Sequence, residues 1–222
     1  MSVDERMVHD IVQKVMANMQ ISGSVSGMHG VFKDMNDAIN ASIEAQKKVC
    51  TMTLDQREQI ISLIRKKTHE NAEILANMGV NETGMGNVGD KILKHHLTAD
   101  KVPGTEDIST IAWSGDRGLT LVEMGPFGVI GAITPATNPS ETVICNCIGM
   151  LAGGNTVVFN PHPNAKKTTI YTINMINEAS IEAGGPDNIA VTAEAPTLDT
   201  SAIMMKHPSI HLLVATGGPG VV

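Results

Sequence analysis

The hydrophobic positions of the first hundred residues follow a helical spacing. Residues 3–19 place apolar side chains three and four positions apart, with charged and polar residues between them. Residues 34–100 continue this pattern, and Thr53 and Gln56 stand in capping-box register at the start of one helix. That helix is predicted to close near Gly79. The chain therefore opens with an amphipathic helix, followed by a helix-rich segment.

The pattern changes after Pro126, where short apolar runs alternate with helical segments. Four strands and three intervening helices are predicted, and such alternation is typical of a doubly wound parallel sheet in an α/β protein. The strands are 129–134, 156–159, 188–192 and 210–215, and the helices are 139–151, 165–183 and 198–206. Two further extended runs within about 108–124 flank a Ser-Gly-Asp-Arg-Gly turn. We predict that they form a projecting hairpin that makes an oligomer contact.

The domain organisation follows from these patterns. Residues 1–20 form an amphipathic helix, residues 21–30 a Gly/Ser-rich flexible linker, and residues 31–222 a nucleotide-binding domain that includes the hairpin. The tethered helix has two interpretations of about equal weight. It folds back on its own domain or a neighbouring subunit, or it docks on a separate partner.

Composition narrows the classes of function. The chain is 42% hydrophobic with 14 methionines, only 2% aromatic residues, and a net charge of −7 without a basic run. A nucleic-acid partner is therefore disfavoured on electrostatic grounds. No apolar span approaches membrane length, and three cysteines are an odd number, so we expect no membrane partner and a reducing, cytosol-like compartment.

The turn after the first predicted strand, from Thr134 to Glu141, is a candidate for chemistry. Asn138 precedes a proline at the first helical position and stands three residues before Glu141, so it is predicted to cap the helix in a capping box. An asparagine amide can accept from the helix with its oxygen and still donate from its NH2 group. Asn138 is thus a candidate both for a cap and for a donor to a developing oxyanion.

Two more turns are predicted at the same edge of the sheet, where ligands of such folds collect. The first contains His162 between two prolines, and a histidine in such a loop is more often structural than catalytic. The second is the glycine-rich turn that begins at Thr216, a weak phosphate-binding signal in isolation. Cys145 and Cys147 fall in an apolar helix and are expected to pack in the core, and no metal site is predicted.

Three stretches together resemble the aldehyde dehydrogenase superfamily, and in particular its CoA-acylating branch. They are GPFGVIGAITPATNP, VVFNPHPNAKK and HPSIHLLVATGGPGVV, and they begin at Gly125, Val157 and His207. The segment from Glu82 to Ile108 is similar to the propionaldehyde and acetaldehyde dehydrogenases of bacterial microcompartments. The leading helix and its tether resemble the encapsulation peptide of those enzymes.

The resemblance implies that a short-chain aldehyde, CoA and NAD are converted into acyl-CoA and NADH through a cysteine thioester. It assigns Asn138 to the oxyanion hole. It also implies a homo-oligomer in the bacterial cytoplasm, inside a microcompartment whose shell protein binds residues 1–20. The implied cofactor contacts are Thr134 and Pro135 near the nicotinamide, Asn160, Pro161 and His162 near the adenosine ribose, and Thr216, Gly217 and Gly218 at the pyrophosphate.

The resemblance also sets limits on this chain. Asn160 and Pro163 stand where many non-acylating relatives have lysine and glutamate, so NAD and NADP both stay open. The family's nucleophilic cysteine is expected beyond Val222, so the chain is interpreted as the N-terminal, cofactor-binding half of the enzyme and as inactive alone. The alternatives are a non-catalytic packaging or interaction module and a non-acylating aldehyde dehydrogenase.

Overall fold

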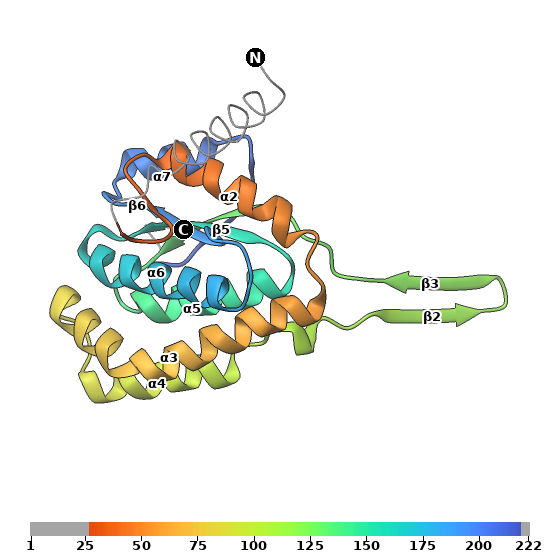
Figure 1. The fold of residues 1–222 in the computed structure, drawn as a ribbon, viewed down its shortest axis with the longest axis horizontal. Coiled ribbons are helices and arrows are strands. Elements are labelled where there is room, and N and C mark those ends of the chain that lie inside the picture. The colour runs from red at the N-terminus through yellow and green to blue at the C-terminus, as the bar shows by residue number, and fades with distance from the viewer. Residues whose placement is uncertain (1–26, 219–222) are drawn as a thin grey trace, which may run out of the picture.

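A five-stranded parallel sheet forms the centre of the molecule (Figure 1). The structure is a computed structural model that describes residues 27–218. The strand order is β1-β6-β5-β4-β7, and every neighbouring pair is parallel. Their bounds are β1 Val31–Phe32, β4 Val129–Thr134, β5 Thr156–Pro161, β6 Ala190–Ala193 and β7 Ile210–Ala215. The predicted α/β fold with a doubly wound parallel sheet is confirmed.

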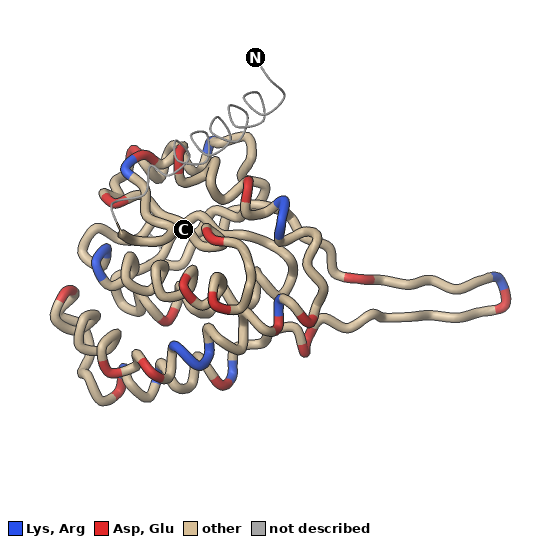
Figure 2. The backbone as a smooth tube through the Cα atoms, viewed as in Figure 1, with Lys and Arg blue, Asp and Glu red and all other residues tan. Residues whose placement is uncertain are grey.

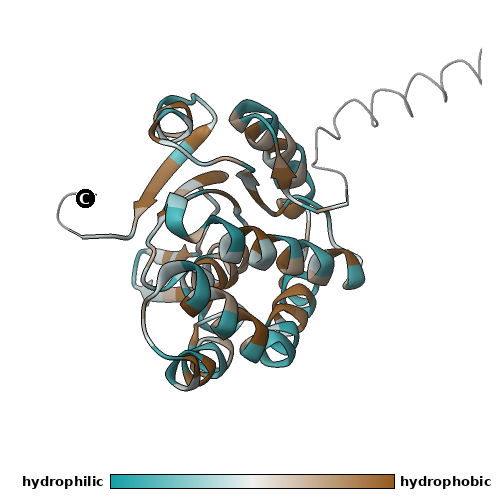
Figure 3. Ribbon diagram, turned by 90° about the vertical axis from the view of Figure 1, so that its left-hand side faces the viewer, coloured by the Kyte–Doolittle hydropathy of each residue, from teal (hydrophilic) through white to brown (hydrophobic). Residues whose placement is uncertain are grey.

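Helices cover both faces of this sheet, as Figure 3 shows from the side. Helices α2 and α7 pack on one face, and α5 and α6 pack on the other. Helices α3 and α4 form a further layer outside α5 and α6. Because helices cover both faces of the sheet, the molecule has two hydrophobic cores, one on each side of the sheet. The helices are α2 Met35–Val49, α3 Leu54–Thr83, α4 Val88–Lys101, α5 Pro139–Ala152, α6 Lys166–Glu182 and α7 Leu198–Lys206, with short 3-10 turns at Thr105–Asp107 and Pro163–Ala165.

The predicted helical layer is present, and α2 is separated from it on the opposite face of the sheet. The capping box at Thr53 and Gln56 is formed as predicted. The predicted end of this helix near Gly79 is wrong, because α3 continues to Thr83 and is followed by the C-cap Gly84, which adopts φ +68° and lets the chain leave the helix. Gly79 is buried beside Lys91 inside the helix and does not end it.

The sequence pattern did not predict β1, which has only two residues. Gly30 precedes β1 with φ +76°, and a Cβ at this position would lie 2.3 Å from the carbonyl oxygen of Ala190 on β6. No side chain fits between the two segments, so only glycine allows β1 to pair here. The predicted amphipathic helix of residues 1–20 lies outside the described residues, as does most of the linker.

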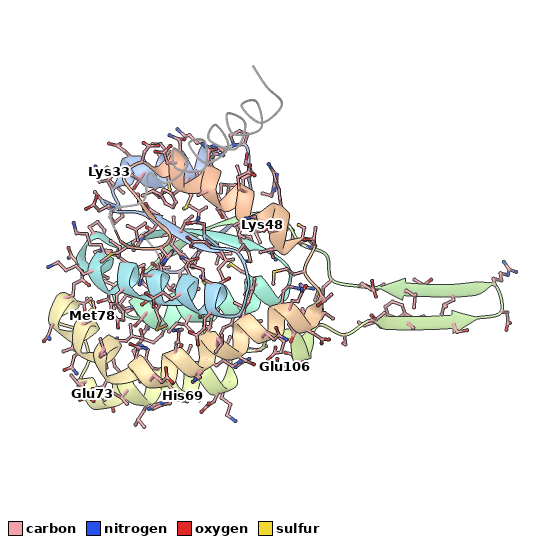
Figure 4. The ribbon with its side chains drawn as sticks, viewed as in Figure 1. Lys33, Lys48, His69, Glu73, Met78 and Glu106 are labelled. Carbon is pink, nitrogen blue, oxygen red and sulfur yellow. The ribbon has the colours of Figure 1, made fainter. Side chains whose placement is uncertain are left out.

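Strands β2 (Ile111–Gly115) and β3 (Gly118–Val122) form the predicted hairpin, which projects far from the sheet (Figure 1). All ten residues are exposed, and the arms carry no charge between the base and the tip (Figure 2). Arg65 of α3 holds the chain near the base by donating to the carbonyl oxygen of Val102 at 2.8 Å and to Glu106 at 3.3 Å, the latter labelled in Figure 4. None of the described helices is both long enough and apolar enough to cross a membrane.

Candidate functional site

A cavity of about 670 Å³ lies at the carboxyl ends of β4, β5 and β7. The three turns that follow these strands line it, together with the start and one side of α7. Backbone hydrogen bonds tie the turns together, since the amide of His162 donates to the carbonyl of Thr134 and the amide of Thr216 donates to the carbonyl of Ile133, both at 3.1 Å. The cavity brings together all nine predicted site residues: Thr134, Pro135, Asn138, Asn160, Pro161, His162, Thr216, Gly217 and Gly218.

The sequence analysis missed the part of the cavity wall that α7 supplies. Leu198, Ser201 and Met205 lie on α7, and Leu198 is 89% exposed although it is a large apolar residue. A leucine this exposed in the lining of a cavity is available to contact an apolar part of a ligand. The alternation of strands and helices predicted α7 but gave no sign that one side of it faces a cavity.

Thr134 ends β4, and its side chain is 1% exposed. Within residues 27–218 its hydroxyl oxygen has no hydrogen-bond partner. An unpaired buried hydroxyl is costly, and such groups in native proteins call for a partner such as a bound ligand. Thr134 therefore places a buried donor and acceptor without a protein partner beside the cavity that the residue lines.

The side chain of Asn160, at the end of β5, is used by the protein itself. Its oxygen accepts from the hydroxyl of Thr200 at 2.7 Å, and its NH2 group donates to the carbonyl of Thr197 at 3.4 Å. These bonds fasten the N-terminus of α7 against the sheet. His162 next to it is exposed, and its Nδ1 accepts from the amide of Asn164 at 3.1 Å, which leaves its Nε2 free to donate in the neutral form.

Asn138 occupies the N-cap position of α5, but the predicted capping box there is wrong. Its side chain makes no bond to the helix amides. Instead, its Oδ1 accepts from Lys94 Nζ at 3.3 Å, and Glu141 pairs with Lys91 at 3.2 Å. Lys94 and Lys91 of α4 thus bind the side chains of Asn138 and Glu141, which the sequence analysis expected to form the capping box. Pattern reasoning along α5 alone gave no signal for this, because the lysines come from a different helix.

A buried polar network joins α4 to the first turn of α5. Lys91 is 3% exposed, and besides Glu141 its ammonium group donates to the carbonyl of Thr137 at 2.9 Å, directly before Asn138. His95 is fully buried, with Nδ1 2.7 Å from the Lys91 carbonyl and Nε2 2.8 Å from Ser140 Oγ. Since a carbonyl only accepts, Nδ1 carries the proton.

Burial lowers the pKa of His95 despite the opposing effect of the Glu141 carboxylate. A neutral imidazole with a proton on Nδ1 has an acceptor at Nε2 for the Ser140 hydroxyl, which shares its one hydrogen with Glu141 Oε2 at 3.2 Å. The network therefore contains one cation and one anion, Lys91 and Glu141, with a neutral histidine beside them. This arrangement fixes the backbone of the turn that carries Asn138 without leaving a net buried charge.

Neither cysteine of α5 is placed as a nucleophile. Cys147 is 2% exposed in the core, and burial raises the pKa of its thiol far above the ordinary value. Burial also raises the pKa of Cys145, with a further contribution from Glu141. Both thiols are therefore protonated at neutral pH and unreactive. In residues 27–218 no group of three or more histidine, cysteine or acidic residues could hold a metal ion.

A second cluster of titratable groups lies on the outer helical layer, and none of its residues lines the cavity. His69 of α3, labelled in Figure 4, stacks on His96 of α4 with ring centroids 4.8 Å apart and contacts Asp100 at 2.8 Å. These side chains are partly exposed and join the two helices to each other. The cluster contributes nothing to the cavity.

Comparison with known proteins identifies the family: residues 17–222 match the aldehyde dehydrogenase family, and the chain belongs to it. Among curated relatives, an acetylating acetaldehyde dehydrogenase of Bilophila wadsworthia is 45% identical over 98% of this chain. The match covers 46% of that relative, so the chain spans about half the length of the curated relatives it matches. The predicted resemblance to the acylating branch is confirmed by these relatives.

Two solved structures share the fold at high sequence identity. A propionaldehyde dehydrogenase from the Clostridium phytofermentans fucose utilisation microcompartment superposes with a TM-score of 0.85 and is 71% identical, covering 86% of this chain and 44% of that one. A propionaldehyde dehydrogenase of Rhodopseudomonas palustris, with bound CoA and an acylated cysteine, gives a TM-score of 0.84 at 47% identity, again covering 86% of this chain and 44% of that one.

Proposed function

We propose that this chain forms the cofactor-binding half of a CoA-acylating aldehyde dehydrogenase. The overall reaction converts an aldehyde, CoA and NAD into acyl-CoA, NADH and a proton. The observation that carries the proposal is the single cavity onto which the three turns of the resemblance converge. Relatives that bear the acetylating name, and a neighbour that holds CoA and an acylated cysteine, support the acylating reaction over release of a free acid.

The residues around the cavity fit a dinucleotide. The buried Thr134 hydroxyl has no partner among the described residues, and a Cβ added at Gly218 would meet nothing within 4 Å, so the backbone there is open to close approach. In the proposal residues 31–222 form the NAD-binding domain. Thr134 and Pro135 border the nicotinamide, Asn160, Pro161 and His162 the ribose, and Thr216, Gly217 and Gly218 the pyrophosphate. When bound, the nicotinamide would accept the hydride that leaves the substrate.

Asn138 is the proposed catalytic residue of this half. The negative charge that develops on the aldehyde oxygen during nucleophilic attack requires a fixed hydrogen-bond donor. The Asn138 amide oxygen is occupied by Lys94, which leaves its NH2 group free to be that donor. The nucleophile itself is not assigned to residues 27–218, because both cysteines of α5 have raised thiol pKa values and the exposed Cys50 does not line the cavity.

The test is an assay of the gene product that contains this chain, with propanal as the substrate. We expect NADH and propanoyl-CoA to form in equal amounts when CoA is present, measured by absorbance and mass spectrometry. Equal NADH production without CoA, with release of propanoic acid, would overturn the acylating proposal in favour of a non-acylating dehydrogenase. Parallel assays with NAD and NADP decide the cofactor preference.

We also propose that the β2–β3 hairpin makes the contact between subunits of a homo-oligomer. Ile111 and Trp113 lie on one side of the ribbon and Leu119 and Leu121 on the other, and all four are 49–65% exposed. Apolar side chains on both sides of a two-stranded ribbon favour burial against another surface. Trp113→Asp together with Leu121→Asp should shift the sedimentation coefficient to that of the monomer. Asp116→Ala at the tip is the control, and an unchanged oligomer in the double variant would contradict the proposal.

Packaging in the lumen of a microcompartment in the bacterial cytoplasm is the last part of the proposal. It rests on the amphipathic pattern of residues 1–20 and on the microcompartment origin of the Clostridium phytofermentans neighbour. Residues 1–20 fused to a reporter should carry it into the compartment by binding a shell protein, and Ile11→Glu with Val15→Glu should abolish this. Loss of folding or oligomerisation on deletion of the segment would contradict the packaging role.

A further inference from the structure

The carboxamide of Asn138 is held in one orientation by a charge from outside its own helix. Lys94 Nζ lies 3.3 Å from Asn138 Oδ1. An ammonium group only donates, so it selects the amide orientation with the oxygen toward it. The NH2 group then lies on the other side of the amide carbon, and no described residue accepts a hydrogen bond from it.

Without Lys94, the amide oxygen would have a strong alternative partner. The side-chain oxygen of an N-cap asparagine ordinarily accepts a hydrogen bond from a backbone amide of the first helical turn. The side chain of Asn138 makes no such bond. Rotation of the side chain to form that cap would move the NH2 group as well. The Lys94 contact therefore competes with the N-terminus of α5 for one oxygen atom.

The backbone beneath Asn138 is fixed by the same helix. Lys91 lies one turn before Lys94 on α4 and donates to the Thr137 carbonyl at 2.9 Å. Lys91 is buried and also neutralises Glu141, whereas Lys94 is exposed and contacts only Asn138 among the described groups. The two lysines thus have separate roles, because Lys91 fixes the main chain of the turn and Lys94 fixes the amide at its end.

We propose that Lys94 is a positioning residue that acts through Asn138 to direct the amide NH2 group toward the substrate oxygen. This inference rests on the proposed function. A cation at the amide oxygen also polarises the amide, which strengthens its N–H groups as donors to a developing oxyanion. Lys94 itself touches neither substrate nor cofactor in this role.

The test is a double-mutant cycle on Lys94 and Asn138 in the gene product that contains this chain. Lys94→Met should lower kcat by about tenfold, a part of the loss expected for removing the oxyanion donor itself, with the KM for NAD unchanged within about twofold. In an Asn138→Ala background the same change should have no further effect, because the residue through which Lys94 acts is gone. Lys94→Arg, which keeps the charge, should restore most of the rate.

The matched control is Lys101→Met, which removes an exposed lysine from the last turn of the same helix. We expect it, like Lys94→Met, to leave the melting temperature unchanged, and to leave kcat unchanged as well. Additive effects of Lys94→Met and Asn138→Ala, or a normal kcat in Lys94→Met, would overturn the inference and leave the proposed function intact. Failure of the unsubstituted protein to form acyl-CoA would instead overturn the proposed function.

Discussion

The N-termini of α3 and α5 carry the same sequence signal and have different structures. Thr53 and Gln56 at the start of α3 form both bonds of a capping box. Asn138 and Glu141 at the start of α5 have the same spacing and form neither, although Pro139 is at the favoured first helical position. The side chains at the start of α3 accept hydrogen bonds from the first backbone amides of that helix. At the start of α5, no side chain of the expected capping box does so.

The difference lies in what surrounds each helix start. Thr53 and Gln56 are exposed, and no other described element supplies a partner that would compete for them. At α5, helix α4 supplies Lys91 and Lys94, and a charge-assisted hydrogen bond is stronger than the neutral bond of a cap. The N-terminus of α5 lies at the edge of the cavity and lacks a side-chain cap. Such departures from local sequence preferences are typical of functional sites.

The largest effect is expected from Lys91→Met. It removes the charge that neutralises Glu141, whose side chain is 8% exposed, and an unpaired buried carboxylate costs about 3–5 kcal/mol of unfolding free energy. Urea unfolding measures this loss. Addition of Glu141→Gln should recover part of it, because the remaining amide carries no charge.

The control for this prediction is Lys66→Met, which breaks the exposed ion pair with Glu70 at 3.9 Å. Such a pair contributes about 0–1 kcal/mol. If Lys91→Met and Lys66→Met reduce the unfolding free energy equally, the buried network does not hold α5 in place, and the comparison between the two helix starts fails.

Asn138→Ala is expected to lower kcat by about 10²–10³-fold through loss of the oxyanion donor. Its unfolding free energy should change by less than about 0.5 kcal/mol, below the ordinary cost of a lost N-cap, because the cap bond is not made. Steady-state kinetics and urea unfolding together measure both effects. Asn138→Asp, which has a similar size but lacks the NH2 donor, should lose activity to a similar degree. A normal kcat in a folded Asn138→Ala variant would remove Asn138 from the mechanism.

Most of the fold could be predicted from the sequence because hydrophobic periodicity records which faces are buried. The strands β4 and β7 and the helix α7 have the predicted bounds. The two-residue β1 could not be predicted, because it is too short to have a period and depends on Gly30 fitting against Ala190.

The candidate site could be predicted only as far as it follows single strands. Thr134, Asn160 and Thr216 come directly at or after strand ends, so topology places them at one edge. Lys91 and Lys94 have no such relation to Asn138 in sequence, since they reach it by the packing of α4 on α5. Tertiary contacts of this kind cannot be recognised in a local sequence pattern. The capping box predicted at α5 was wrong for this reason, because the lysines of α4 bind Asn138 and Glu141.

The pH dependence of stability should reveal the neutral His95. Burial lowers its pKa in the folded state, so below the unfolded value of about 6.5 the unfolded chain binds more protons. Stability is therefore retained above this pH and lost as the pH falls toward the lower folded pKa, with a slope of up to about 1.4 kcal/mol per pH unit. His95→Gln should flatten this slope below a pH of about 6.5 in urea unfolding.

The exposed His211 of β7 provides the control for this measurement. His211→Gln also removes an imidazole, but this imidazole does not belong to the network of Lys91 and Glu141. The slope of stability against pH should therefore equal that of the unsubstituted protein. If His95→Gln and the unsubstituted protein lose stability in parallel below a pH of about 6.5, the acid sensitivity arises elsewhere and His95 does not need to be neutral for α4 to pack on α5.

The smallest effect is expected from Thr53→Ala, which tests the other half of the comparison. The Thr53 hydroxyl accepts from the amide of Gln56 at 3.2 Å, and loss of such a cap costs about 1 kcal/mol. Because Thr53 is remote from the cavity, kcat should stay at the unsubstituted value. Thr53→Ser, which keeps the hydroxyl, should restore the stability. Thr53→Ala should lower stability and leave kcat unchanged, whereas Asn138→Ala should lower kcat and leave stability unchanged. This pair of results would establish that the same sequence signal serves folding in α3 and catalysis in α5. Equal stability losses at both would mean that Asn138 caps α5 in solution.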